Sequence, residues 1–235
     1  MPRQKSFMAH PLYEGVPPGT VRTTRDGERV FDAGSAATHA YFLQTGAVEV
    51  RHEEPGGLGV VVKVLAAPNL FGVIEQLGAE PFYLESVRSL GDARMVGIAR
   101  DRFLQALQAS PPWCFAVLQN TGTAFCMAAR FEPGQLATPE AKLANYVLAL
   151  LEVASRDGAR VELKRSQADF AEAIGASERS VSRILTRWQE EGVLDKQRGR
   201  YELQRRDVLV SIAGPLAGSL VFRGDAERKR GKESA

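Results

Sequence analysis

Length, composition and charge exclude several classes of protein. The chain has 235 residues, 44% of them hydrophobic and 25% charged, and its formal net charge is +2. This is ordinary globular material, which excludes a disordered or collagen-like chain, and no stretch approaches the roughly 18 apolar residues of a membrane span. The N-terminal region lacks the apolar segment of a secretory signal, and two cysteines are too few for a disulfide framework. We therefore expect a cytoplasmic protein of one large domain or two smaller ones, with no membrane partner.

The small net charge hides a difference between two parts of the chain. Residues 1–137 carry 12 Lys and Arg against 13 Asp and Glu, a net charge of −1, whereas residues 138–235 carry 18 against 15, a net charge of +3. A local basic excess favours binding to nucleic acid only if one surface gathers the charges. The position of the basic residues therefore matters more than their sum.

Residues 20–99 show the alternation of apolar and polar residues that is typical of β-strands. Turn signals separate the runs about every 8–12 residues, among them Gly46 and Gly91-Asp92. This spacing predicts an antiparallel sandwich or barrel, and the absence of strand–helix alternation disfavours a Rossmann sheet. The predicted strands are Glu28–Phe31, Ala40–Leu43, Ala47–Arg51, Val60–Leu65, Tyr83–Val87 and Ala93–Ile98.

A short helix capped by Asp101 and then a long helix are predicted to follow the strands. Ser110-Pro111-Pro112 starts the long helix, and Glu132-Pro133-Gly134 breaks it and is the best hinge candidate. Its apolar stripe is a natural seam between two subunits, although the flank of a β-sandwich would also bury such a stripe. The residues predicted at a dimer interface are Trp113, Ala116, Val117, Asn120, Thr123, Ala124, Met127 and Phe131.

The pattern that bears most on function lies between Lys164 and Leu194. Ser166 is a cap for one helix, which Gly175 ends, and Ser177 is a cap for a second helix over residues 178–191. Two helices joined by a short turn with glycine form the helix-turn-helix motif. A β-hairpin with a basic tip follows, which is typical of the wing in a winged helix.

The outward face of the second helix has the chemistry of DNA recognition. An α-helix fits the major groove of B-DNA, where arginine binds guanine and glutamate accepts from cytosine. Serine hydroxyls and further basic side chains suit phosphates. Two short helices with a glycine turn also occur without this function, so the caps, the preceding strand and the basic hairpin strengthen the interpretation. The residues predicted to contact DNA are Lys164, Arg165, Ser166, Ser177, Glu178, Arg179, Ser180, Ser182, Arg183, Arg187, Arg198 and Arg200.

Residues 20–210 resemble the Crp/Fnr superfamily of bacterial transcription regulators. The resemblance rests on Phe31-Asp32-Ala33-Gly34, Tyr41–Val50 and Phe71-Gly72 in the β part and on Ser166–Leu185 in the helical part. It implies an α+β chain with an N-terminal antiparallel β jelly roll, a long dimerisation helix and a C-terminal winged helix-turn-helix domain. We place the cyclic-nucleotide-binding-like domain at residues 1–109, the dimerisation helix and hinge at 110–137, the DNA-binding domain at 138–222 and a basic, disordered tail at 223–235.

The same resemblance implies a function. Members bind a two-fold operator as homodimers held by the long helix, here Pro111–Phe131, and regulate transcription by contacting promoter DNA and RNA polymerase. Most have glutamate where this chain has Arg179, and here glutamate comes one residue earlier, at Glu178. Arg183 keeps its place. We therefore expect Arg183 to bind guanine and the operator to differ from the usual half-site of the family.

The effector pocket also departs from the cyclic-AMP-responsive members that this chain resembles. Their ribose-binding glutamate falls on Val73, their phosphate-binding arginine and serine fall on Tyr83 and Leu84, and Met127-Ala128 stands where they have Thr-Ser. A shifted register would instead use Glu75 with Arg88-Ser89. We expect that the protein does not respond to cyclic AMP, which leaves another nucleotide, an apolar small molecule, a protein partner or no effector. The degenerate pocket is predicted at Phe71, Gly72, Val73, Glu75, Tyr83, Leu84, Arg88 and Met127.

Enzymes, metal sensors and scaffold proteins are the competing classes. No Walker A, Gly-x-Ser-x-Gly, His-Glu-x-x-His or Cys-x-x-Cys motif occurs, so we expect neither an enzyme nor a cofactor. Cys114 and Cys126 are too few for an iron–sulfur cluster, and the three histidines are scattered, although a thiol switch across a dimer stays open. The alternative to a DNA-binding regulator is a ligand-sensing regulatory or scaffold subunit that does not act through DNA.

Overall fold

The computed structural model of the chain describes residues 11–53, 59–79, 81–129, 138–154, 162–163, 165–197, 200–214, 217 and 220–223. The chain divides into two compact units. The first comprises residues 1–50, 65–129 and 222–235, and the second comprises residues 51–64 and 130–221. Antiparallel strands and helices are both abundant, so the α+β class predicted from the sequence is confirmed.

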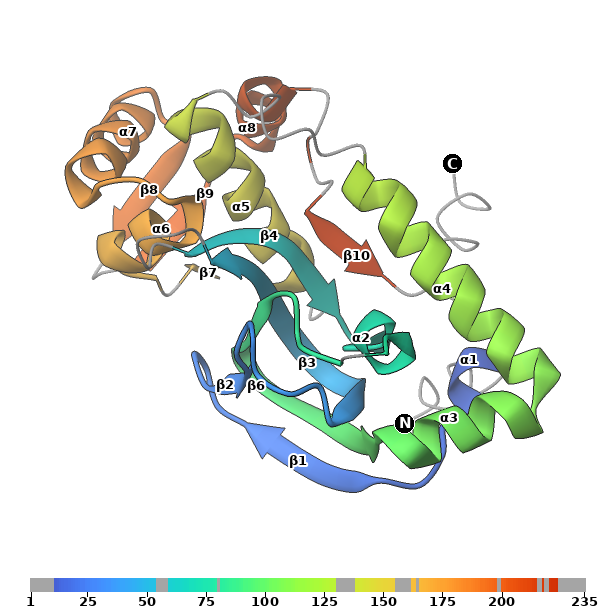
Figure 1. The fold of residues 1–235 in the computed structure, drawn as a ribbon. Helices are drawn as coiled ribbons and strands as arrows, with labels where there is room; N and C mark the ends of the chain where they lie inside the picture. Colours follow the sequence, from blue (N-terminus) through green and yellow to red (C-terminus); the bar gives the residue numbers. More distant parts are fainter. Residues whose placement is uncertain are drawn as a thin grey trace. The chain divides into compact units, whose positions relative to one another are not determined.

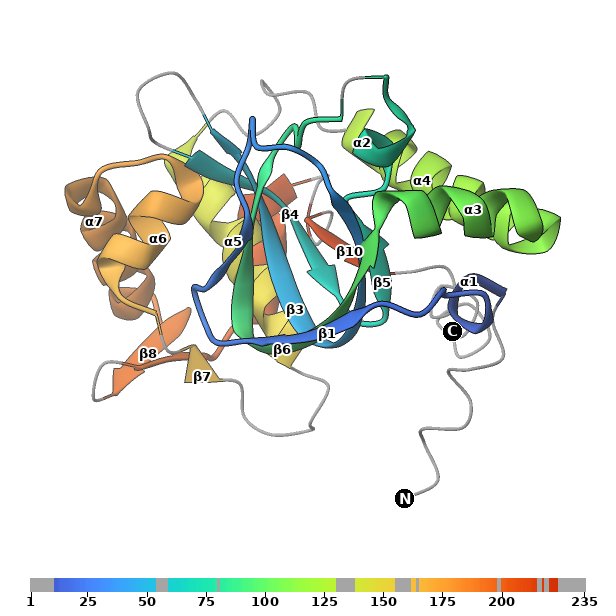
Figure 2. The same ribbon diagram turned by 60° about the horizontal axis from the view of Figure 1, so that its bottom comes forward.

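The strands that alternate apolar and polar residues belong to one antiparallel sheet, drawn in blue to green in Figures 1 and 2 except for β10, which is red. Its order among the described residues is β1-β6-β3-β4-β10, with β2 also paired to β6 and β5 to β3. Their bounds are β1 (Thr20–Thr24), β2 (Arg29–Phe31), β3 (His39–Glu53), β4 (Gly59–Ala66), β5 (Asn69–Phe71), β6 (Ser86–Ala99) and β10 (Val221–Arg223).

Two predicted turns instead lie inside long strands. Gly46 has φ +82° within β3 and Gly91 has φ +73° within β6, so each strand joins two of the predicted ones. Glycine adopts positive φ at little cost, and the pairing continues through the bend. At Gly46 space is a second requirement, because a Cβ would lie 2.8 Å from the Cα of Ala93 in β6.

The segment before β6 also differs from the prediction. Tyr83 was expected in a strand, but β6 begins only at Ser86. Tyr83 instead pairs with a loop, since its N–H donates to the carbonyl of Ser35 at 2.9 Å and its carbonyl accepts from Gly34 at 2.8 Å. This loop pairing turns the Tyr83 side chain into the first unit, where it is 3% exposed.

The helices of the first unit extend from the sheet and pack on its core. They are α1 (Pro11–Glu14), α2 (Ile74–Leu77), α3 (Arg100–Ala109) and α4 (Pro111–Ala129). Trp113 of α4 is buried with Phe103 and Leu12; its indole N–H donates to the Leu12 carbonyl at 3.0 Å, and its ring meets Phe103 edge-on at 5.5 Å. The start of α4 is therefore anchored in its own unit.

The second unit is built around the apolar helix α5 (Pro139–Ala154), which contacts α6, α7 and α8. Phe170 of α6 is fully buried, with its ring 6.2 Å from that of Tyr146 in α5 and 5.7 Å from that of Tyr201 in β9. A small antiparallel sheet of order β7-β9-β8 lies beside these helices (Figure 1). The remaining bounds are β7 (Glu162–Leu163), α6 (Gln167–Ile174), α7 (Glu178–Glu190), β8 (Leu194–Gln197), β9 (Arg200–Leu203) and α8 (Arg206–Ala213).

The C-terminal region differs from the sequence prediction in two ways. Helix α8, which the sequence analysis did not place, begins at Arg206 and ends at Ala213. Val221–Arg223 then forms strand β10, which pairs with β4 and was not predicted. No helix among the described residues combines the length and the apolar character that crossing a bilayer requires.

Candidate nucleic-acid interface and effector site

The helix-turn-helix formed by α6 and α7 is capped at the predicted residues. The Ser166 hydroxyl accepts from the Asp169 N–H at 3.1 Å, and the Asp169 carboxylate accepts from the Ser166 N–H at 2.8 Å. Gly175 ends α6 in the left-handed region, with φ +64°. The Ser177 hydroxyl accepts from the Ser180 N–H at 3.2 Å and begins α7. The caps fix where the recognition helix starts.

Helix α7 has two faces of opposite character. Val181, Ile184, Leu185 and Trp188 are buried against the rest of the second unit. This apolar face provides most of the helix's stability, because a 13-residue helix is marginal by itself. The other face is polar and exposed at Glu178, Arg179, Arg183 and Arg187, whereas Ser182 is half-buried.

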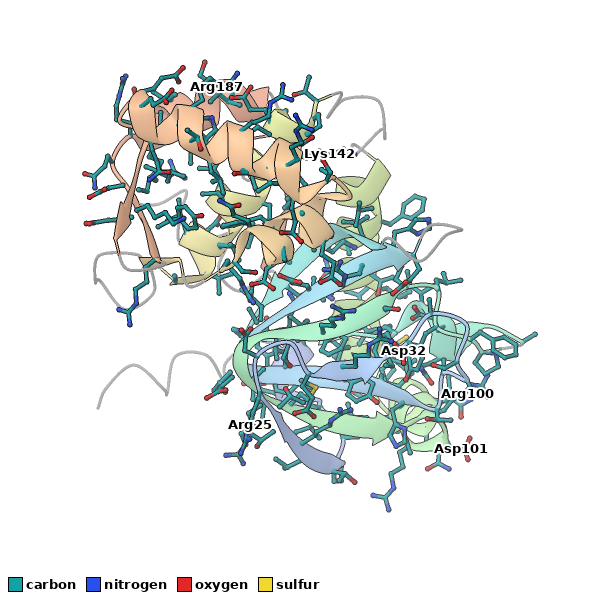
Figure 3. All side chains as sticks on the ribbon, turned by 90° about the vertical axis from the view of Figure 1, so that its left-hand side faces the viewer. Arg25, Asp32, Arg100, Asp101, Lys142 and Arg187 are labelled. Carbon is teal, nitrogen blue, oxygen red and sulfur yellow. The ribbon has the colours of Figure 1, made fainter. Side chains whose placement is uncertain are left out.

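The Glu140 carboxylate, in the first turn of α5, joins that helix to α7. Its Oε1 accepts from the indole N–H of Trp188 at 2.9 Å and forms an ion pair with Arg187. The Trp188 ring is fully buried, so its N–H needs this internal acceptor. The hydrogen bond to Glu140 also raises the pKa of Arg187. Arg187 is labelled at the surface of the second unit in Figure 3, yet it already has a partner within the chain.

The other residues predicted to contact DNA vary in their availability. The hydroxyls of Ser177 and Ser180 lie 3.0 Å apart and bond to each other, so both serve the cap. Arg165 is half-buried and Arg200 is exposed at the start of β9, and each has a further interaction in the chain. Lys164 and Arg198 lie outside the described residues.

Part of the predicted dimer interface is buried within the first unit. Trp113, Ala116 and Val117 are 5% exposed or less and belong to the core of their own unit, together with Phe103. Asn120 is also buried. Thr123 and Ala124 are half-buried, the side chain of Met127 is not described, and Phe131 lies outside the described residues. The stripe that the sequence singled out therefore faces mostly inward.

A different stripe of α4 is exposed and apolar. Phe115, Leu118 and Phe125 are 62%, 55% and 67% exposed. With Gly122, which is exposed and has nothing within 4 Å of a Cβ position, they follow spacings of three, four and three residues. That is the a/d spacing of a coiled coil.

Aromatic rings fill the region predicted as the effector pocket. Tyr83 stacks on Phe31 with ring centroids 3.6 Å apart, and Tyr41 stacks on Phe71 at 5.3 Å. The Tyr83 hydroxyl donates to the carbonyl of His39 at 2.7 Å. Burial raises the pKa of Tyr83, so the phenol stays neutral. Tyr83, which the resemblance aligns with a phosphate-binding arginine, is thus an uncharged ring.

Polar groups next to these rings are also engaged within the chain. The Gln76 amide donates to the carbonyls of His39 and Gly72, both at 3.0 Å. Arg100 donates to the carbonyls of Gln76 at 3.1 Å and Gly78 at 3.0 Å. The bond from Gln76 to His39 holds α2 to β3, and the bonds from Arg100 hold α2 and Gly78 to α3.

The remaining residues of the predicted pocket differ in exposure and in the elements that carry them. Val73 is buried, and Leu84 is 69% exposed. Glu75 lies in α2, and Arg88 lies in β6 opposite Arg29 of β2. Cys114 and Cys126 are free thiols. Among the described residues no three His, Cys, Asp or Glu side chains gather as they would around a metal ion.

Comparisons with known proteins agree with this two-part architecture. Residues 21–110 match the family model of the cyclic nucleotide-binding domain, and residues 141–212 match that of the Crp-like helix-turn-helix domain. The chain belongs to the Crp/Fnr superfamily. A curated member, the global nitrogen regulator of Synechocystis sp., is 26% identical over 175 residues, which cover 72% of this chain and 77% of that protein.

Solved structures of other Crp/Fnr members share the fold. FixK2 from Bradyrhizobium japonicum is 17% identical with a TM-score of 0.66, over 84% of this chain and 98% of that one. The c-di-GMP-responsive global regulator CLP of Xanthomonas campestris is 18% identical with a TM-score of 0.67, over 86% of this chain and 97% of that one. At these identities the likeness shows the fold of the superfamily alone.

Three features of the sites were missed from the sequence. Glu140 has no local signal, because its partners lie 47 and 48 residues away, at Arg187 and Trp188. The ring contacts of Phe31 and Tyr41 join separate strands and needed the fold. The exposed stripe of α4 did have a signal, since the spacing of its members is visible in the sequence.

Replacement of Glu140 tests its role in holding α7. Glu140→Ala leaves the Trp188 N–H buried without its acceptor, so we expect a loss of about 1–3 kcal/mol in the free energy of unfolding. Glu190→Ala, at an exposed position of α7, is the matched control and should change it by about 0.5 kcal/mol or less. Urea denaturation measures both. Equal values for the two variants would contradict the structural role of Glu140.

Proposed function

We propose that the chain is a sequence-specific DNA-binding transcription regulator that binds a two-fold operator as a homodimer and does not respond to cyclic AMP. Helix α7 enters the major groove, and promoter DNA and RNA polymerase are the expected partners of a member of this superfamily. The observation that carries the proposal is the face of α7, where Arg179 and Arg183 are exposed.

Support for DNA binding comes from how α7 is packed and capped. Its apolar face is buried, its start is capped by Ser177, and Glu140 ties its C-terminal half to α5. The helix is therefore rigidly held, while its polar face is open to a ligand. A rigid helix with exposed arginines suits direct contact with guanine in the major groove.

Support for a homodimer comes from the exposed stripe of α4. Phe115, Leu118 and Phe125 together expose more apolar surface than isolated surface residues usually do. Their a/d spacing fits a second copy of the same helix, and Gly122 between them allows two helix backbones to approach closely. A two-fold dimer would present two α7 helices to a two-fold operator.

Support for a lost response to cyclic AMP comes from the rings around Tyr83. A cyclic nucleotide needs a cation for its phosphate and an acceptor for its ribose hydroxyl. Tyr83 and Val73 provide neither, because Tyr83 is a neutral ring stacked on Phe31 and Val73 is a buried apolar side chain.

DNA binding is tested by titrating duplex operator, selected from a random library, at several salt concentrations. We expect log affinity to fall linearly with log salt, because phosphate contacts release counterions. Arg183→Ala should cost about 1–3 kcal/mol of binding free energy and relax the preference at one base pair. Arg102→Ala, at an exposed site of α3, is the matched control and should bind as the wild type does. Salt-independent or absent binding would instead favour a scaffold subunit that does not act through DNA.

The dimer is tested by placing a charge on the exposed stripe. Leu118→Glu would bury an unpaired carboxylate at the seam, so we expect the dimer dissociation constant to rise by about 100-fold or more. Gln119→Glu, one residue away at an exposed position off the stripe, should leave it unchanged. Sedimentation velocity measures both. A Leu118→Glu protein that remains as dimeric as the control would exclude this seam.

The lost response to cyclic AMP is tested by calorimetry on the purified protein. We expect no heat of binding for cyclic AMP up to millimolar concentration, because Tyr83 stands where the resemblance places the phosphate-binding arginine. Binding of operator DNA by the same preparation shows that the protein is active. A micromolar dissociation constant for cyclic AMP would overturn this part of the proposal.

A further inference from the structure

Helix α7 carries a row of three arginines, at Arg179, Arg183 and Arg187. They are four residues apart, so their side chains follow one another along nearly the same face of the helix. All three are exposed. The row lies on the face that the unit leaves open, opposite the buried Val181 and Leu185.

The three arginines differ in whether they have a partner within the chain. Arg187 is ion-paired with Glu140, whose carboxylate is held in place by the indole of Trp188. Arg179 and Arg183 have no hydrogen-bond or ion-pair partner within the part of the chain that the structure describes. One arginine is thus used internally, and the other two present all their donors to solvent.

The sequence around Arg179 and Arg183 provides no acid to balance them. The neighbours three and four residues from each on the helix are glycine, alanine, serine, threonine or another arginine. Two like charges at positions i and i+4 destabilise a helix. Glu178 is adjacent to Arg179 in the sequence, but adjacent residues point in different directions on a helix, so Glu178 does not lie in the arginine row. This arrangement is unfavourable in the free protein and favourable only when acceptors lie against both guanidinium groups.

We propose that Arg179 and Arg183 each bind a guanine of the same half-site, with one base pair between the two guanines. The proposal rests on the proposed function and adds Arg179 as a second specificity-determining residue. A guanidinium donates two parallel hydrogen bonds to O6 and N7 of guanine, which no other base accepts in the same way. Four residues of helix rise about 6 Å, and base pairs are stacked about 3.4 Å apart. The two arginines therefore reach positions about two steps apart.

Contact with bases, rather than with phosphates, follows from the place of Arg179 in the helix. It is the second residue of α7, and the first turns of a recognition helix are the part that reaches base edges. The Ser177 and Ser180 hydroxyls beside it bond to each other. Among the side chains of this turn, Arg179 is the one with a bidentate donor free.

The experiment compares Arg179→Ala, Arg179→Lys, Arg183→Ala and Arg187→Ala on the operator that the wild-type full chain selects from random duplex DNA. Every single-base variant of one half-site is titrated against each protein. For the wild type, replacing either guanine should weaken binding by about 5- to 150-fold. With Arg179→Ala, replacing one of the two guanines should no longer change the affinity. With Arg183→Ala, the same should hold for the other guanine, two base pairs away. Arg187→Ala should keep both penalties.

The lysine variant separates base contact from phosphate contact. Lysine keeps the charge but lacks the planar fork, so Arg179→Lys should lose discrimination at the same guanine as Arg179→Ala. The proposal is overturned if Arg179→Ala keeps the wild-type penalty at every guanine, or if it weakens binding equally for all sequences and lowers the salt slope by about one. A wild-type chain that selects no preferred sequence would overturn the proposed function itself. Circular dichroism confirms that each variant is folded.

Discussion

The buried indole of Trp188 is the constraint on which the position of the recognition helix depends. A fully buried N–H needs an acceptor, and Glu140 provides one from the first turn of α5. The same carboxylate pairs with Arg187. One side chain therefore determines both how α7 sits on α5 and which arginine of its outer row is used inside the protein. Arg179 and Arg183 on the same face are exposed.

Burial of aromatic rings has a different consequence in the first unit. Tyr83 and Phe31 stack in the region predicted as the effector pocket, and the neutral phenol of Tyr83 bonds to a backbone carbonyl. A site for a phosphate anion needs an unpaired cation, and Arg100 is committed to the carbonyls of α2. The chain thus keeps the fold of the superfamily, and we propose that it has lost the chemistry of the cyclic AMP site.

Sequence reasoning was most successful where structure is set by local patterns. Ser166, Gly175 and Ser177 mark helix ends through contacts within a few residues, and the structure has them there. Sequence patterns were ambiguous where one residue type occurs in two structures. Glycine is found both at turns and at bends inside strands, and Gly46 bends a strand instead of ending it. On α4 two apolar stripes coexist, and only packing against Phe103 shows that Trp113 faces inward. The role of Glu140 could not be predicted from the sequence, because Glu140 and Trp188 are 48 residues apart and only the fold brings them together.

Methylation interference on the selected operator tests the central claim most directly, since methylation of guanine N7 blocks the acceptor that an arginine fork uses in the major groove. The account predicts two guanines in each half-site whose methylation prevents binding, separated by one base pair, with the half-sites about 10 base pairs apart from centre to centre. Bound DNA that tolerates methylation at every guanine N7 would contradict entry of α7 into the major groove through Arg179 and Arg183.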